Sequence, residues 1–252
     1  MQFYIGPDGA LYVIDYYRQI IEHPEWMSED VNKSGALYNG SDKGRIYRIT
    51  PISTPKMNWC NKIDLGKAST EQLVKTLASN NIWWRRNAQR LLMDRKDSST
   101  IRLLKALLDT TNSPTAVVHA LWTLDGFNAT DPLILIKALH NSTSGVRENA
   151  TLIAELHLND FPQLEKELLP SQNDPSAKVR YQLLCTLGNM HDALSQAAQQ
   201  KILMKDVNDK WVQVAALTSS NGNEMALLEK SIAAYLPRLL KAKLYSFQIV
   251  QT

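Results

Sequence analysis

Between about residue 70 and residue 217 the chain alternates between two kinds of amphipathic segment, and the second kind carries a recurring motif. In each copy a register position is followed at +3, and again at +4, +6 or +7, by small or aliphatic residues. This spacing places them on one face of an α-helix. The register positions lie 30 to 33 residues apart, at Arg85, Val117, Arg147, Arg180 and Gln213. Periods of this length are typical of stacked helical pairs, which bury their apolar faces against one another.

The segments before each motif are expected to form the first helix of each pair. Ser69 and Thr70 offer a cap, and Glu71 supplies an early acidic residue, as at a helix N-terminus. We predict a mainly α fold, an α-α superhelix of about five HEAT-like helical pairs over residues 69–220, with a C-terminal helical extension over 221–252. The first helices are predicted over residues 71–78, 99–108, 132–140, 161–168 and 193–204.

Residues 1–51 follow a different pattern, typical of β structure. Two short β-rich runs, 3–5 and 10–15, flank a Gly6-Pro7-Asp8-Gly9 turn, which predicts a hairpin. A connection rich in Gly, Asn and Ser follows over 32–43, and the alternating run 44–49 predicts a further strand. Three strands cannot bury both faces of a sheet, so the segment resembles the end of a larger β structure. Residues 52–68 are predicted to be a linker.

Three blocks in this segment carry a resemblance to a known family. They are GPDGALYVIDYY at 6–17, IEHPE at 21–25 and GSDKGRIYRI at 40–49. In this order they resemble the last blade of the β-propeller in a bacterial family of membrane-bound dehydrogenases, which is related to the soluble sugar and sorbosone dehydrogenases that use pyrroloquinoline quinone. In that family HEAT-type repeats follow the propeller, often with a cytochrome c domain after them. The resemblance therefore extends over about residues 2–220.

The resemblance implies pyrroloquinoline quinone (PQQ) and haem c as cofactors of the relatives, but this chain departs from the family pattern. It has material for one blade, whereas a propeller needs about 4 to 8 blades to close. It has no Cys-x-x-Cys-His haem-attachment motif. We therefore expect no cofactor and no catalytic residue here. Asp15, Tyr16, Tyr17 and His23 are what a propeller active site would take from this blade, and we expect them to pack in loops.

Three arginines share the register position of the repeats and are expected to stack along one surface. One interpretation is a ladder that binds an anionic ligand. The other, which we favour, is a structural ladder that joins adjacent repeats by charge-assisted hydrogen bonds. The ladder residues are Arg85, Arg147 and Arg180, and the residues that could partner them are Asn81, Asp174 and Asp209, shortly upstream.

The first repeat carries the main aromatic and basic cluster of the chain, which includes Arg95 and Lys96. Such surfaces can bind nucleic acid, with Arg on phosphates and Trp stacked on bases. A Trp pair at this place would equally seal the repeats against the β segment. We favour packing, then a protein partner, then nucleic acid. The candidate interaction surface comprises Trp83, Trp84, Arg86, Arg90, His119, Trp122 and Tyr181.

Composition and charge limit which partners, cellular locations and metal sites the sequence allows. The net charge of the 252 residues is +3, too small by itself to indicate nucleic acid or a membrane surface as partner. We expect no membrane span, because no apolar run approaches about 18 residues, and the start of the chain has no signal-peptide pattern. The relatives are expected to be periplasmic or exported, so the location stays open. Cys60, Cys185 and the five histidines show no metal-ligand spacing, and no metal is expected.

Three functions are compatible with these patterns. The first is a non-catalytic scaffold or protein-interaction module, the C-terminal part of a protein similar to quinone-dependent sugar dehydrogenases. Its partner would be another protein or the upstream propeller domain. The second is a contribution to dehydrogenase activity by completing a propeller. The third is nucleic-acid binding by the helical repeats, which we favour least.

Overall fold

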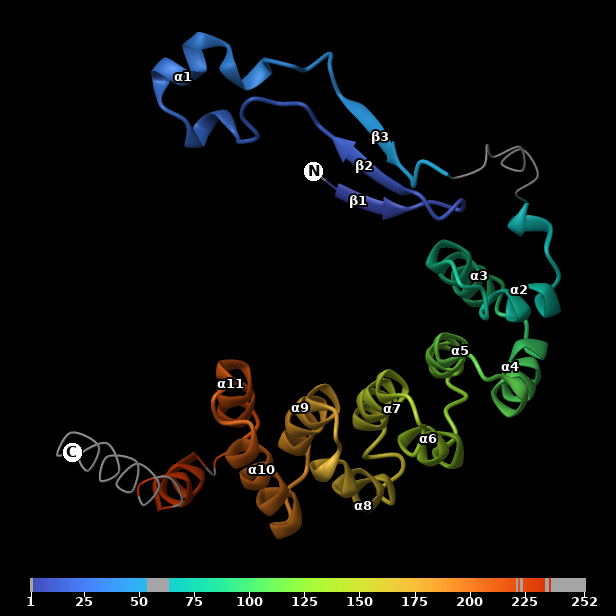
Figure 1. Cartoon of the computed structure of the whole chain (residues 1–252), viewed down its shortest axis with the longest axis vertical. Helices are drawn as coiled ribbons and strands as arrows, with labels where there is room; N and C mark the ends of the chain where they lie inside the picture. The colour runs from blue at the N-terminus through green and yellow to red at the C-terminus, as the bar shows by residue number, and fades with distance from the viewer. Residues whose placement is uncertain (1, 54–63, 221, 223, 234–235, 237–252) are drawn as a thin grey trace, which may run out of the picture. The chain divides into compact units, whose positions relative to one another are not determined.

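The computed structural model describes residues 2–53, 64–220, 222, 224–233 and 236. Its fold is mainly helical, with a three-stranded antiparallel sheet near the N-terminus (Figure 1), as the sequence predicts. The chain divides into two compact units, residues 1–103 and 104–252. The division falls inside α4 (Ser99–Thr110).

The sheet of the first unit confirms the predicted hairpin and the predicted third strand. Its order is β1-β2-β3, with Phe3 opposite Val13 and Tyr12 opposite Arg48. Gly9, at the end of the turn, has φ 78°, a left-handed conformation that glycine adopts without steric cost. The strands are β1 (Gln2–Ile5), β2 (Leu11–Asp15) and β3 (Arg45–Ile49).

Asp8 ties the hairpin turn to the far strand. Its side chain is fully buried, and Oδ2 accepts hydrogen bonds from Arg48 Nε at 2.7 Å and from the Tyr12 hydroxyl at 3.2 Å. Burial raises the pKa of Asp8, but the hydrogen bonds from Arg48, the Ala10 backbone and Tyr12 outweigh it and hold the pKa below its ordinary value. The turn is therefore held by charge as well as by backbone geometry.

The connection between β2 and β3, predicted as a loop over 32–43, contains short helices, and in this respect the prediction was wrong. The acidic residues Glu29 and Asp30 in the first turn of α1 favour a helix start, and Gly35 with φ 73° ends it. One and a half turns are too few to show a helical periodicity in the sequence. The elements are η1 (Pro24–Trp26), α1 (Glu29–Ser34) and η2 (Ala36–Tyr38).

The helices of the first unit begin at the predicted cap. Ser69 and Gln72 form a capping box, in which each side chain accepts a hydrogen bond from the other residue's backbone N–H, at 3.2 and 2.8 Å. Leu73 and Leu92 are buried between the two helices of the pair. The elements are η4 (Leu65–Lys67), α2 (Thr70–Thr76) and α3 (Ile82–Arg95).

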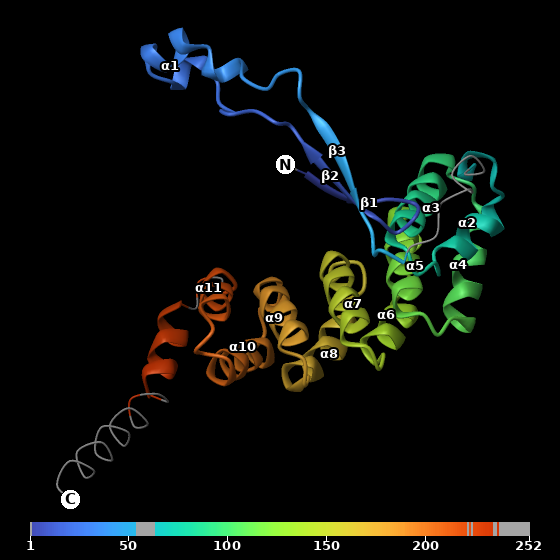
Figure 2. The ribbon, with the colours of Figure 1, turned by 45° about the horizontal axis from the view of Figure 1, so that its top comes forward.

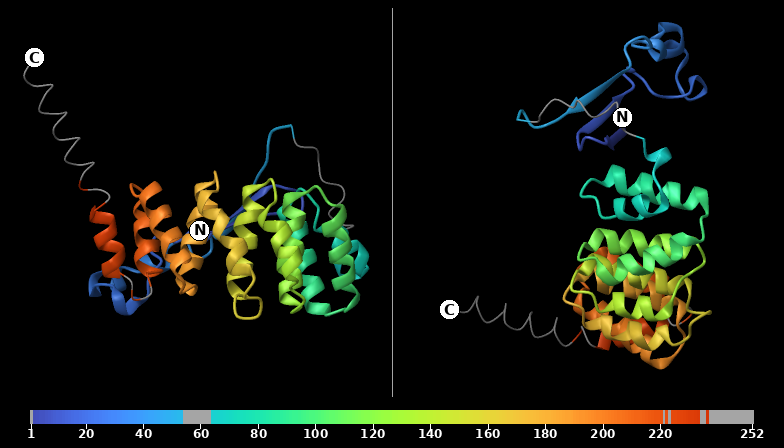
Figure 3. Two further views of the ribbon diagram at one scale, coloured as in Figure 1. Left: turned by 90° about the horizontal axis from the view of Figure 1, so that it is seen from below. Right: turned by 90° about the vertical axis from the view of Figure 1, so that its right-hand side faces the viewer.

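The second unit stacks its helix pairs in chain order. Helices α5, α7, α9 and α11 form one row, and α6, α8 and α10 form the other (Figures 1 and 2). Figure 3 shows the same succession from two further sides. Residues 224–233 are also helical. The elements are α5 (Pro114–Gly126), α6 (Pro132–Leu139), α7 (Ser144–Leu156), α8 (Leu164–Leu168), η5 (Leu169–Asn173), α9 (Ala177–Thr186), η6 (Leu187–Asn189), α10 (Ala193–Lys205) and α11 (Lys210–Thr218).

The predicted repeat is confirmed by burial. The +3 position is at most 1% exposed in every copy, and an alanine occupies it in all copies except Leu183. A small residue here lets neighbouring helices approach closely. The first helices lie within a few residues of their predicted bounds, with one larger shift: α8 begins at Leu164 rather than 161, because Phe161 and Pro162 form a turn that precedes it.

Some sequence predictions fall outside the described residues. These are Cys60, the linker over 54–63 and the C-terminal extension over 237–252. Cys185, which the structure does describe, is a half-buried free thiol. None of the helices in the described ranges combines the length and apolar character needed to cross a membrane.

Candidate interaction site

The three register arginines make the same contact with their own repeat. In each, Nη1 donates to the carbonyl oxygens six and five residues earlier, in the turn before the second helix. Gln213, at the register position of the last repeat, donates to the Val207 carbonyl in the same way, at 2.6 Å. The arginine bonds run from Arg85 to Ser79 and Asn80 (2.6 and 2.8 Å), from Arg147 to Asn141 and Ser142 (2.8 and 3.0 Å), and from Arg180 to Asp174 and Pro175 (2.7 and 3.1 Å).

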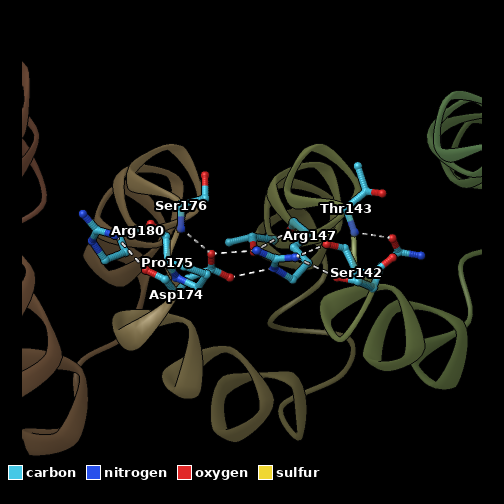
Figure 4. A network of polar contacts seen from close by, with 9 residues as sticks. Ser142, Thr143, Arg147, Asp174, Pro175, Ser176 and Arg180 are labelled. Atoms are coloured by element: carbon cyan, nitrogen blue, oxygen red, sulfur yellow. Dashed lines mark hydrogen bonds and ion pairs between the residues drawn. The ribbon is translucent and has the colours of Figure 1, made fainter.

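In the second unit the same guanidinium groups also reach the next repeat. Nε and Nη2 of Arg147 donate hydrogen bonds to the Asp174 carboxylate, at 2.6 and 2.8 Å. Nε and Nη2 of Arg180 donate to the Asp206 carboxylate in the same way, at 2.7 and 2.6 Å. Asp174 additionally accepts from the Ser176 N–H at the start of α9 (Figure 4). Because Asp174 offers its carboxylate to one arginine and its carbonyl to the next, the contacts join successive repeats into a continuous ladder.

Burial makes these ion pairs stronger than surface pairs. The side chains are 13% and 7% exposed in the Arg147–Asp174 pair, and 6% and 20% exposed in the Arg180–Asp206 pair. Burial raises the pKa of Asp174, but the hydrogen bond from Arg147, the Ser176 N–H and the charges of both arginines hold it below its ordinary value. Arg147 and Arg180 each use four of the five donors of a guanidinium within the protein. This arrangement favours a structural role over anion binding.

Of the three upstream residues named as possible partners, Asp174 is a ladder partner: its carbonyl accepts from Arg180, and its carboxylate pairs with Arg147 of the preceding repeat. The carboxylate partners of Arg147 and Arg180 thus come in each case from the following repeat. Asn81 and Asp209 instead cap helices, accepting hydrogen bonds from the N–H groups of Trp83 and Trp211, both at 2.8 Å. Asp206, which the sequence reading missed, lies 26 residues after Arg180, much as Asp174 lies 27 after Arg147. The positions 26 and 27 residues after Arg85 hold Thr111 and Asn112.

Arg85 lies in the first unit and differs from the other two arginines. It is 8% exposed, and its Nε has no hydrogen-bond partner among the described residues. The contact that Arg85 shares with Arg147 and Arg180 is therefore the one with the turn of its own repeat.

Trp84 and Asn81 hold the hairpin turn against the start of α3. Trp84 Nε1 donates to the Pro7 carbonyl at 2.9 Å, and Asn81 Nδ2 donates to the carbonyls of Gly6 and Pro7 at 3.0 and 3.1 Å. Trp83 packs edge-on to Trp84, with ring centroids 5.0 Å apart. Trp84 and Asn81 thus connect the β segment to the first helical pair.

The basic residues of the same cluster fall into two groups. Arg95 donates to backbone carbonyls of the segment 65–68, which ties the end of α3 to the turn before α2. Arg86 and Arg90 are exposed on α3. Two residues of the aromatic and basic cluster, Trp84 and Arg95, therefore make intramolecular contacts.

The remaining residues of the candidate surface belong to the second unit. Trp122 Nε1 donates to Asn149 Oδ1 at 2.8 Å and joins α5 to α7. His119 lines a shallow groove of about 230 Å³ between these helices, together with Val118, Val146 and others. Tyr181 lines a larger groove on the row of α7, α9 and α11. The candidate surface is thus divided between the two units.

The larger groove, here called the Trp211 groove, has a volume of about 690 Å³ and is open to solvent. Two aromatic side chains on it are exposed, Trp211 at 60% and Tyr181 at 37%. The sequence reading missed Trp211, although the residue lies two positions before the last register position. The groove is lined by Glu148, Ala177, Lys178, Tyr181, Lys205, Asp206, Asn208, Asp209, Trp211 and Val212.

A histidine between two carboxylates joins the C-terminal ends of α5 and α7. His157 Nε2 lies 2.6 Å from Asp125 Oδ1, and Nδ1 lies 3.2 Å from Asp160 Oδ2. Carboxylates only accept hydrogen bonds, so this geometry is fully satisfied when both ring nitrogens carry protons. Burial lowers the pKa of His157, but the hydrogen bonds to Asp125 and Asp160 outweigh it and raise the pKa. Across the described ranges, no group of three or more His, Cys, Asp or Glu could hold a metal ion.

The fold and the site together define a helical-repeat protein with an arginine ladder and an N-terminal three-stranded sheet. Residues 1–53 match a family model described as a domain of unknown function (DUF7133). No curated protein and no solved structure matches the chain. The match covers the sheet and the three sequence blocks noted above, and it lies outside the helical repeats.

Proposed function

We propose that the chain is a non-catalytic helical-repeat scaffold that binds a protein partner in the Trp211 groove. The observation that carries this proposal is the exposure of Trp211 and Tyr181 on one groove. Tryptophan and tyrosine are enriched among the residues that dominate binding energy at protein interfaces, where their large side chains are buried by the partner. Here both stand open to solvent on neighbouring second helices.

The arginine ladder supports this role by holding the groove in shape. Asp206, which lines the groove, forms a bidentate ion pair with Arg180. The same arginine donates a hydrogen bond to the Asp174 carbonyl in the turn before α9. A surface whose helices are cross-linked by buried ion pairs loses little freedom on binding, and less of the interaction energy goes into ordering it.

The test is affinity capture from source cells with the full chain as bait, quantified by mass spectrometry. We expect Trp211→Ala and Tyr181→Ala to weaken capture of the specific partner about tenfold or more, the loss typical of dominant interface aromatics. Trp26→Ala is the matched control, because Trp26 is 79% exposed and lies in the β segment. Equal capture by all three variants and the natural chain would refute the proposal.

A relation to the quinone-dependent sugar dehydrogenases is the second part of the proposal. It is supported by the three sequence blocks that resemble a last propeller blade and by the uncovered state of the sheet. Strands β1 and β3 are exposed along their whole length, with Phe3 at 61% and Ile46 at 66%. A sheet with large apolar side chains in water is suited to packing against further β structure.

The corresponding activity would be a contribution to a dehydrogenase through completion of a propeller. Mixing the chain with a separately expressed upstream propeller should then produce quinone-dependent dye reduction that neither piece shows alone. No dye reduction in the mixture would sink this second function and leave the scaffold proposal standing. A blot of source cells with an antibody against the repeats gives the native size, to be compared with 28.5 kDa for this chain.

A further inference from the structure

The acidic and basic side chains that line the Trp211 groove differ in whether they have partners within the protein. Asp206 forms a bidentate ion pair with Arg180. Asp209 Oδ1 caps α11 by accepting a hydrogen bond from the Trp211 N–H. Lys178 and Lys205 are exposed, and neither has an ion-pair or hydrogen-bond partner among the described residues. The acidic groups are thus mostly engaged with the protein, while the two ammonium groups are available to a ligand.

A third cation lies at the edge of the groove. Lys210 Nζ is 5.1 Å from the centroid of the Trp211 ring. Glu148, on α7, is the lining carboxylate with no hydrogen-bond or ion-pair partner within the described ranges. Arg180 offsets the charge of Asp206, so Lys178, Lys205 and the nearby Lys210 stand against the two carboxylates of Glu148 and Asp209, and the groove carries a small excess of positive charge.

We propose that the Trp211 groove binds a short acidic peptide segment of a partner protein, with an apolar side chain as its anchor. The anchor lies against Trp211, Tyr181 and Val212, and flanking Asp or Glu residues meet Lys178 and Lys205. This inference rests on the scaffold function proposed above and adds the chemical class of the partner. The aromatic rings provide most of the affinity, and the charges provide selectivity and a faster association.

The charge pattern favours a peptide over a nucleic acid. Asp209 and Glu148 line the same groove as the lysines, and they would repel a continuous row of phosphates. A peptide can place its acidic groups at the lysines and leave the other positions neutral. Its main-chain groups can also exchange hydrogen bonds with the exposed Asn208.

The test is selection of a phage-displayed random peptide library against the full chain. We expect the selected sequences to contain Asp or Glu on either side of an aromatic or aliphatic residue. A synthetic peptide of the most frequent sequence, labelled with a fluorophore, then gives affinities by anisotropy. Lys178→Glu with Lys205→Glu should weaken its binding about tenfold or more, and raising the salt concentration should weaken it as well.

Lys201→Glu is the matched control, because Lys201 is exposed on α10 and does not line the groove. Trp211→Ala tests the groove itself. Loss of binding with Trp211→Ala, but no effect of the double lysine reversal beyond that of Lys201→Glu, would overturn the acidic class and leave the scaffold function intact. Peptides that bind Trp211→Ala as well as the natural chain would overturn both. Competition by single-stranded DNA at low salt would assign the lysines to nucleic acid and would also overturn the proposal.

Discussion

Removing the guanidinium of Arg180 should destabilise the second unit strongly. In Arg180→Ala the carboxylate of Asp206 loses its partner, and the carbonyls of Asp174 and Pro175 lose their donor. Breaking a buried pair by removing one member costs about 3–5 kcal/mol. Arg180 is 6% exposed but Asp206 is 20% exposed, so water can rehydrate part of the carboxylate. We therefore expect a loss near the lower end, about 3 kcal/mol.

The assay is urea unfolding followed by far-UV circular dichroism, with thermal unfolding as a second readout. For a unit of this size a loss of about 3 kcal/mol corresponds to a lower Tm by about 6–12 °C. Arg86→Ala is the matched control, because Arg86 is exposed on α3 and should change stability by no more than about 0.5 kcal/mol. Since replacing a whole buried pair by apolar residues is often neutral, Arg180→Met with Asp206→Leu should recover much of the loss.

Two results would refute this reasoning. If Arg180→Ala unfolded at the same urea concentration as Arg86→Ala, the ladder would not be structural. If the double variant were less stable than Arg180→Ala, the cost would not come from an uncompensated carboxylate.

Three further predictions concern other parts of the chain. The raised pKa of His157 means that its carboxylate contacts stabilise the fold fully below about pH 6.5 and lose that contribution as the pH rises through the folded pKa. His157→Gln should therefore cost about 1 kcal/mol near pH 5.5 and progressively less as the pH rises through the folded pKa, and a difference independent of pH would contradict the doubly protonated ring. Trp84→Phe removes the indole donor to the hairpin turn and should speed proteolysis of the β segment without lowering the Tm of the repeats; unchanged proteolysis would mean that the hydrogen bond does not hold the turn. Hydrogen exchange should be fast over residues 2–50 and slow over 70–217, because the strands are exposed and the repeats are buried, and equal protection would show that the sheet is covered.

The repeat could be predicted from the sequence because it depends on local spacing. Small and aliphatic residues at fixed offsets from Arg85, Arg147 and Arg180 define one helical face, and a helix must bury such a face. The cap at Ser69 and the glycine turn before β2 are likewise short-range devices that depend on neighbouring residues. The short helix α1 was missed because its six residues carry no periodicity.

The carboxylate partners of the ladder arginines could not be predicted from local sequence patterns. The arginine register was visible in the sequence, but the partners Asp174 and Asp206 lie 26 to 27 residues downstream. Which of several nearby acidic residues faces a guanidinium depends on the rotation of one helical pair against the next. That rotation is set by packing across the whole interface and not by any local signal.

The Trp211 groove was decided by tertiary structure in the same way. Tyr181 and Trp211 belong to different repeats, and sequence spacing does not say whether two aromatic residues are buried or exposed. Exposure depends on what each neighbouring element covers. The sequence also does not show that Asp206, which lines the groove with Lys178 and Lys205, is paired with Arg180 and leaves both lysines available to a ligand.

Local patterns along the chain are enough to specify helical repeats with a β segment before them, because hydrophobic periodicity and turn residues act over a few residues. Tertiary structure alone decided which arginines and carboxylates meet, how the hairpin turn meets Trp84, and which aromatic side chains stay in water. These contacts join residues 26 to 77 positions apart in the sequence, and they arise when packed helices fix their mutual orientation.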